Sequence, residues 1–127
     1  MMTGDHATLE SLTKRLTAFR DARDWQQFHS IKNLIISLNL EAAELMELIQ
    51  WKSEEAVELL SETESGKARI AEEFADVFLY LLLIAERAGL DLAGIALAKI
   101  ATIDLKYPVE KARGNALKYT ELQGLSK

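Results

Sequence analysis

The sequence contains no cysteine, which excludes disulfide bonds, thiolate nucleophiles and zinc sites built on cysteine. It has one proline and six glycines, too few turn-forming residues for a fold of many short strands. Apolar residues make up 49% of the chain and charged residues 28%, so the chain is too apolar for disorder. We therefore expect one helical domain over residues 1–127, with its core at about 8–108 and a polar tail at 109–127.

A long apolar run and a dense basic cluster are missing as well. The longest apolar run, residues 77–85, is far shorter than the ~20 residues that a membrane-spanning helix needs. Residues 1–9 lack the apolar core of a signal peptide, so we expect a cytoplasmic protein that does not bind membranes. Because the net charge is −5 and no basic patch is present, polymeric nucleic acid is not an expected partner.

The spacing of apolar residues predicts two helices in the first part of the chain. A first amphipathic helix starts near Leu9 and ends near Ala22, and residues 24–30 form a break that contains several large side chains. A second helix should cover about residues 31–50, and Glu41 falls within its apolar stripe. A carboxylate on the face of a helix that is otherwise apolar is a candidate functional group.

Three further helices are predicted after residue 50. Ser53 can cap a short third helix, residues 61–66 read as a connection, and a fourth helix should cover about 67–88 with Gly89 as its C-terminal cap. This fourth helix is apolar nearly all round between residues 74 and 85, which predicts an oligomer, a homodimer or a homotetramer. Asp91 can cap a fifth helix that ends near Lys106. The expected fold is all-α, an antiparallel bundle of four to five helices.

Two pairs of carboxylates have the spacing that places both members on one face of a helix: Glu41 with Glu44, and Glu73 with Asp76. Glu44 and Glu73 each lie six residues from the expected connection, so in antiparallel helices the two pairs would face each other. Carboxylates that converge on an apolar interior need protonation or a cation. Ligation by oxygen alone suits Mg²⁺, or Mn²⁺, better than zinc.

Two other interpretations compete with this divalent-metal site. A di-iron bundle needs Glu-x-x-His pairs, and neither His6 nor His29 has a glutamate three residues before it. A helical interaction protein would use its apolar fourth helix for docking, and its acidic pairs would only be solvated helix faces. Binding of Mg²⁺ or Mn²⁺ distinguishes a metal site from the interaction protein.

Four segments carry a resemblance to a known family: RDWQQFH, EAAELMELIQWK, EEFADVFLYLL and KYPVEKARGNALKYTEL. Together they resemble the MazG-like nucleotide pyrophosphohydrolases, and within them the dCTP pyrophosphatase branch. The resemblance implies a helical, tetrameric Mg²⁺ enzyme that acts on dCTP or a related nucleoside triphosphate. Such an enzyme cuts between the α and β phosphates and releases pyrophosphate.

The resemblance also implies roles for individual residues. It assigns Mg²⁺ binding and catalysis to Glu41, Glu44, Glu73 and Asp76. It assigns the nucleoside pocket to Trp25, Phe28, His29, Trp51 and Tyr80. Lys99 and Lys106 are candidates for contacts with the phosphates because of their charge. The chain departs from the family at Ile103, where the family commonly has asparagine, so polar contacts from the fifth helix are in doubt.

Overall fold

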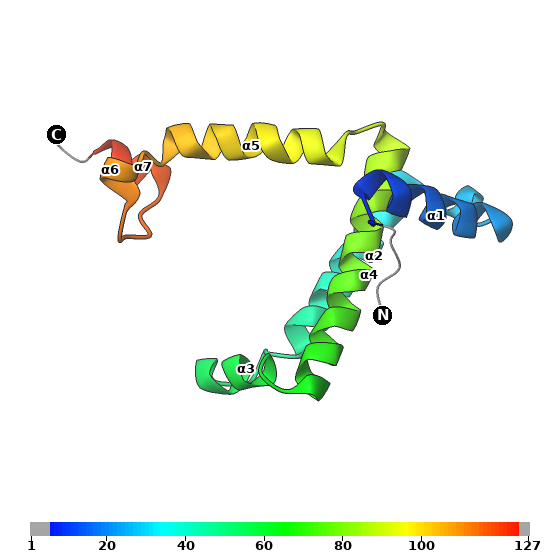
Figure 1. Cartoon of the computed structure of the whole chain (residues 1–127), viewed down its shortest axis with the longest axis horizontal. Helices are drawn as coiled ribbons and strands as arrows, with labels where there is room; N and C mark the ends of the chain where they lie inside the picture. Colours follow the sequence, from blue (N-terminus) through cyan, green and yellow to red (C-terminus); the bar gives the residue numbers. More distant parts are fainter. Residues whose placement is uncertain (1–5, 125–127) are drawn as a thin grey trace. The chain divides into compact units, whose positions relative to one another are not determined.

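The computed structural model describes residues 6–124, and within this range the chain is helical with no β-strand. Figure 1 shows the helices in chain order. Their bounds are α1 Leu9–Ala22, the 3₁₀ turn η1 Gln26–Phe28, α2 Ile31–Glu47, α3 Glu54–Leu60, α4 Glu64–Ala88, α5 Leu92–Lys106, α6 Val109–Ala112 and α7 Tyr119–Gln123. The elements form two compact units, one with α1 to α4 and one with α5 to α7, and each is described by itself.

Side-chain caps fix where the helices of the first unit begin. The hydroxyl oxygens of Thr8, Ser30 and Ser53 each accept a hydrogen bond from the backbone N–H three residues later, at 3.0, 3.1 and 3.2 Å. These bonds satisfy N–H groups that the first turn of a helix leaves without partners. The predicted cap at Ser53 is confirmed, as is the start of the first helix at Leu9.

The start of α4 differs from the prediction. The helix begins at Glu64, three residues before the expected Lys67, because the Thr63 hydroxyl accepts a hydrogen bond from the Gly66 N–H at 3.0 Å. Gly66, expected in the connection, is instead a buried residue in the first turn of α4. A Cβ atom at this position would overlap the carbonyl oxygen of Leu60. The segment 61–66 therefore serves partly as a cap and partly as helix.

Other boundaries show smaller differences. The regular part of α2 ends at Glu47, and the chain continues in turns to residue 52. Gly89 ends α4 with φ 69°, in the left-handed region, as predicted. Asp91 occupies the N-cap position of α5, but its side chain makes no capping hydrogen bond. The break at residues 24–30 contains the short turn η1, and Asp24 in it has φ 54°.

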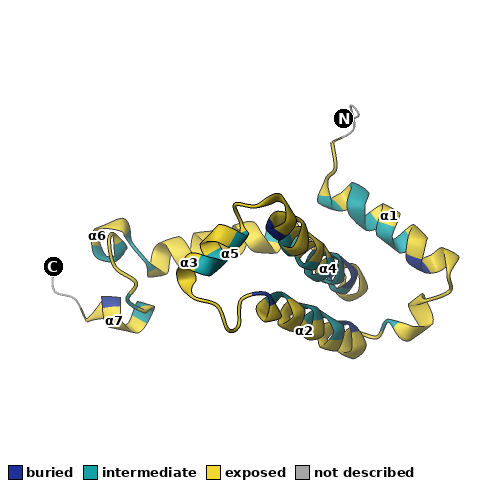
Figure 2. Cartoon of the chain, turned by 90° about the horizontal axis from the view of Figure 1, so that it is seen from below, coloured by how far each residue is buried: buried dark blue, intermediate teal, exposed yellow. Residues whose placement is uncertain are grey.

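The core of the first unit lies between α2 and α4, which pack side by side along most of their length (Figure 1). Leu34 of α2 and Leu82 of α4 are each 2% exposed, and Leu48 and Leu83 are also buried. The buried positions follow the facing sides of the two helices (Figure 2), and α1 contacts α4. The prediction of an all-α fold is confirmed.

The second unit contains α5 and two short helices, α6 and α7, within the tail that the sequence predicted only as polar. The backbone N–H of Tyr119 donates to the Tyr107 hydroxyl at 3.2 Å, which links the start of α7 to the end of α5. Leu122 of α7 is 1% exposed, and the Lys106 ammonium lies 5.6 Å from the centre of the Tyr119 ring. These contacts order a segment whose polar composition gives little helical signal.

Candidate active site

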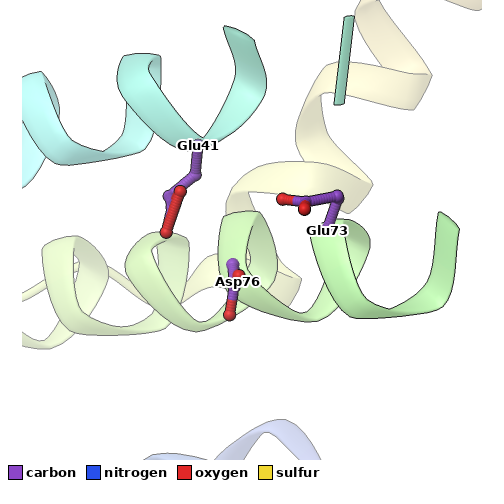
Figure 3. Close-up of side chains that lie close together, drawn as sticks. All are labelled: Glu41, Glu73 and Asp76. Carbon is purple, nitrogen blue, oxygen red and sulfur yellow. The ribbon is translucent and has the colours of Figure 1, made fainter. Parts of the chain in front are cut away.

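The acidic cluster lies where α2 and α4 pass each other. Glu41 comes from α2, and Glu73 and Asp76 come from adjacent turns of α4 (Figure 3). Each of the three offers one carboxylate oxygen, and these oxygens all lie within 4.8 Å of one another. Glu44, the fourth predicted ligand, lies outside this group of three. It lines a groove of about 310 Å³ on the same helix pair, together with Glu73 and Arg69.

The pKa values of two carboxyls, Glu41 and Glu73, are raised in this cluster, where negative charges crowd together. The pKa of Glu41 rises to about 7, first because of a side-chain hydrogen bond with Glu44, then because of burial, and then because of the charges of Glu44, Asp76 and Glu73. Burial is also the largest cause that raises the pKa of Glu73, followed by the charge of Glu44. In the absence of a cation, the folded protein therefore resists full ionisation of this cluster.

One oxygen of the cluster is left without a partner. Glu73 Oε2 is buried and accepts no hydrogen bond from the described part of the chain. A buried acceptor without a partner costs free energy unless another group reaches it. A divalent cation would satisfy this oxygen and offset the repulsion among the carboxylates. The all-oxygen ligand set is of the kind that Mg²⁺ and Mn²⁺ prefer. The cluster is thus a group that could bind a divalent metal.

A cavity of about 210 Å³ adjoins the cluster. Its lining includes Glu41 and Asp76, and the remaining residues are Leu16, Phe19, Arg20, Trp25, His29, Leu79, Tyr80 and Leu83. The carboxylates of Glu41 and Asp76 belong both to the acidic cluster and to this cavity. A molecule that enters it can therefore contact apolar and aromatic side chains while another part of the same molecule reaches the cluster.

Aromatic and polar groups shape the cavity on the side of α1. The rings of Phe19 and Trp25 pack edge to face with centroids 5.7 Å apart, and the Arg23 guanidinium lies 3.6 Å from the centre of the Phe19 ring. His29 Nδ1 is buried and makes no hydrogen bond to the described residues. Burial lowers the pKa of His29, and the nearby charge of Arg20 lowers it further. His29 is accordingly a neutral group with an open hydrogen-bonding position.

The structure brings together some of the predicted nucleoside-pocket residues and leaves others apart. Trp25, His29 and Tyr80 line the cavity. Phe28 and Trp51 do not line it, and they are 61% and 90% exposed. Trp51 follows α2 in a turn, after the helix has passed the acidic cluster. In a single chain, the side chain of Trp51 therefore lies mostly in solvent.

The predicted phosphate contacts belong to the second unit. Lys99 and Lys106 are exposed residues of α5, and Ile103, where the resemblance expects asparagine, is 43% exposed on the same helix. The first unit offers a basic residue of its own beside the acidic cluster, Arg69 of α4. Sequence patterns give no reason to choose Arg69, because an arginine on a polar helix face is common.

Arg20 is a second residue that the sequence prediction missed. It is 5% exposed, lines the cavity, and forms ion pairs with Asp21 at 2.8 Å and with Glu86 at 2.9 Å. Arg20 follows Leu16 by four residues, so it lies next to the apolar stripe of α1. A charge beside an apolar stripe is the signal that could have identified it. Its partner Glu86, far along the chain on α4, has no comparable signal.

The helices in residues 6–124 include none with the combination of length and apolarity required to cross a bilayer. The fold and the cluster define an all-α protein with a candidate divalent-metal centre between its two central helices. Residues 36–122 match the model of the MazG-like family, and the chain belongs to this family. The predicted family is therefore confirmed.

Several relatives are similar to this chain over most of its length. The chain is 39% identical over 115 residues to dCTP pyrophosphatase 1 of Bos taurus and 37% identical to that of Homo sapiens, with 91% of this chain and 68% of each relative covered. Among solved structures, a pyrophosphatase from Archaeoglobus fulgidus superposes with a TM-score of 0.74 at 34% identity, covering 85% of this chain and 99% of that one. These matches agree with the helical fold described above.

Proposed function

We propose that this chain is a nucleoside triphosphate pyrophosphohydrolase that converts dCTP or a related deoxynucleotide to its monophosphate and pyrophosphate. Membership of the MazG-like family supports this function, as do relatives named as dCTP pyrophosphatases. The observation that carries the proposal is the convergence of oxygens from Glu41, Glu73 and Asp76 at the edge of an apolar cavity. Such a site can hold a charged triphosphate and an aromatic base at the same time.

The cofactor in this proposal is Mg²⁺, with Mn²⁺ as the alternative. Glu41, Glu73 and Asp76 would hold the ion, and Glu44, whose charge acts on Glu41, would complete the ligand set. Glu73 Oε2, which is buried and has no hydrogen-bond partner in the described part of the chain, supports this fit. When bound there, the ion would supply electrostatic stabilisation of the phosphates.

The side chains of the chain itself would perform the remaining tasks. The apolar wall of the cavity excludes water from the base, and the Trp25 ring offers a surface for stacking. A carboxylate of the cluster accepts the proton of the water molecule that attacks the α-phosphorus. The new P–O bond forms as the bond to the bridging oxygen breaks, and pyrophosphate leaves. Arg69, and Lys99 and Lys106 of α5, are candidates for binding the leaving group.

The proposal includes a homodimer or a homotetramer as the functional form. In the single chain, large apolar side chains such as Leu40, Trp51 and Phe74 are 62%, 90% and 58% exposed. Exposed apolar side chains of this size and number are unusual for a monomer. A second copy of the chain would cover them.

The decisive experiment is product analysis with purified protein, dCTP and Mg²⁺. We expect deoxycytidine monophosphate and pyrophosphate in equal amounts, with no orthophosphate released first. Orthophosphate as the first product would refute the assigned cleavage site, and no turnover of any nucleoside triphosphate would refute the function. Glu55, an exposed residue of α3, provides a matched control because Glu55→Gln should retain activity while Glu73→Gln loses it.

A further inference from the structure

The cavity beside the acidic cluster contains a buried cation that the proposed chemistry does not use. Arg20 of α1 is 5% exposed and lines the cavity together with Trp25 and His29. Its Nε–H donates to Asp21 at 2.8 Å, and its Nη1 donates to Glu86 at 2.9 Å. The described residues accept no hydrogen bond from Nη2, so an N–H group of Nη2 can donate to a molecule that reaches it.

These ion pairs fix the orientation of the guanidinium. Asp21 is the next residue on α1, whereas Glu86 comes from α4, so the guanidinium is fixed between the two helices that wall the cavity. A buried arginine that is held by two carboxylates loses little further freedom when it donates to a ligand. His29 Nδ1, also buried and without a partner among residues 6–124, offers a second polar position in the same lining.

The cavity suits one part of a nucleotide. Its volume of about 210 Å³ is below the ~300 Å³ at which pockets begin to enclose whole drug-sized ligands. Its lining is mostly apolar and aromatic, and the carboxylates Glu41 and Asp76 are the members that it shares with the metal cluster. With the triphosphate at the carboxylates, the base is the part that would occupy the cavity.

We propose that Arg20 is a specificity-determining residue whose Nη2 donates a hydrogen bond to N3 of a cytosine ring in this cavity, and that Glu86 is a positioning residue that holds its guanidinium. This inference rests on the proposed function for the placement of the triphosphate. N3 of cytosine carries no hydrogen and accepts a hydrogen bond, so one N–H of Nη2 can donate to it. In uracil and thymine, N3 carries a hydrogen, which would meet an arginine N–H and leave both donors unsatisfied.

The test compares dCTP with dUTP, which share the sugar and the triphosphate and differ in the base. We expect the parent to prefer dCTP, and Arg20→Gln to lower kcat/KM for dCTP by roughly 10- to 100-fold, mainly through KM, with a smaller effect on dUTP. Arg20→Lys should retain part of the preference for dCTP over dUTP. Glu86→Gln should lower this preference, as Arg20→Gln does. Arg15 is an exposed arginine of the same helix, and Arg15→Ala should leave kcat/KM unchanged for both dCTP and dUTP.

Controls separate recognition of the base from stability. Arg20→Gln leaves Glu86 without its ion pair, so the double variant Arg20→Gln with Glu86→Gln provides a neutral pair at the same place. Melting curves identify any variant that fails to fold. If a folded variant loses activity equally for dCTP and dUTP, Arg20 only links α1 to α4 and the inference is wrong.

Binding without turnover separates this inference from the proposed function. Calorimetry with dCMP and dUMP, in the presence of a chelator, measures selection of the base without hydrolysis. Preference of the parent for dCMP that disappears in Arg20→Gln supports the inference even if no triphosphate is cleaved. Cleavage of dCTP by a parent that binds dCMP and dUMP equally would overturn the inference and leave the function standing. Absence of both cleavage and binding would overturn both.

Discussion

At the scale of single residues, Glu41 contributes to both stability and the proposed chemistry. It lies within the apolar stripe of α2, and its carboxyl is close to those of Glu44, Glu73 and Asp76. Without a cation, ionisation of Glu41 adds a negative charge to a cluster that already repels it. With a cation, the same charge would contribute to ligand binding. The state of the site therefore decides whether this carboxylate stabilises or destabilises the fold.

The substitution Glu41→Gln tests this dual role. We expect the variant to be at least as stable as the parent in the presence of a chelator, because one charge is removed from the cluster. Activity should fall on the order of 100-fold, the scale expected when one group that stabilises the transition state is lost. Stabilisation by Mg²⁺ should also shrink, since it depends on affinity for the folded state. A destabilised variant with full activity would contradict the proposed role of Glu41.

The raised pKa of Glu41 predicts how metal-free stability depends on pH. The folded-state pKa is about 7, above the ordinary value of 4.5, so the folded protein binds more protons than the unfolded chain between these values. The free energy of unfolding should therefore fall as pH rises from about 4.5 to 7. Urea denaturation with chelator across this range measures the effect. In Glu41→Gln the free energy of unfolding should depend less on pH over this range. An unchanged dependence would show that other groups cause it.

At the scale of secondary structure, the junction between α3 and α4 sets the position of the Glu73 and Asp76 pair. Thr63 caps α4, and Gly66 in the first turn allows the carbonyl of Leu60 to approach closely. Because α4 begins at this junction, its register relative to α2 depends on how the chain turns here. That register decides whether Asp76 lies near Glu41.

We expect Gly66→Ala to destabilise the protein by ~1–3 kcal/mol, the range typical of overpacking. In an ordinary helix the change from glycine to alanine is stabilising by roughly 0.5–1 kcal/mol. A loss of stability in Gly66→Ala would therefore indicate the close approach of Leu60. Gly94→Ala provides the control: its Cβ would meet only the Asp91 side chain, which can move. Thermal or urea melting of both variants measures the difference, and equal effects at the two sites would contradict the role of the close approach at Gly66.

At the scale of the whole molecule, one chain buries little of its apolar surface. Leu34, Leu48, Leu82, Leu83, Ala85 and Leu122 are the buried apolar residues in the described range. Phe74, one turn before Phe78 on α4, is 58% exposed, and Leu40 on α2 is 62% exposed. A small chain with such a limited core gains stability from association. The exposed residues lie on the same two helices that carry the acidic cluster.

Light scattering at micromolar concentration should therefore give a mass that is a multiple of 14.2 kDa, the mass of one chain. The melting temperature should rise with protein concentration, because mass action favours the associated, folded form. Phe74→Glu should lower the measured mass by placing a charge on an exposed apolar position. A monodisperse monomer whose melting temperature is independent of concentration would contradict the oligomer.

The sequence by itself determined the all-α class, the family and most helix boundaries. These features depend on local patterns: apolar spacing, the cap at Ser53, and the glycine that ends α4. The spacing of the carboxylates also indicated that each pair shares a helix face. The start of α4 was misplaced because Thr63 and Gly66 read as loop residues, and only the close packing at Leu60 makes them part of a helix terminus.

Tertiary structure alone decided which residues meet. It brought Glu41, Glu73 and Asp76 together and left Glu44 outside that group, because the register of two packed helices depends on many side chains at once. It joined Arg20 to Glu86 across 66 positions of sequence and buried Arg20 beside Trp25 and His29, while Glu86 stays exposed. Spacing patterns in a sequence predict local conformation, because they depend on residues that are close together in the chain. They do not predict contacts between residues that are far apart in the chain.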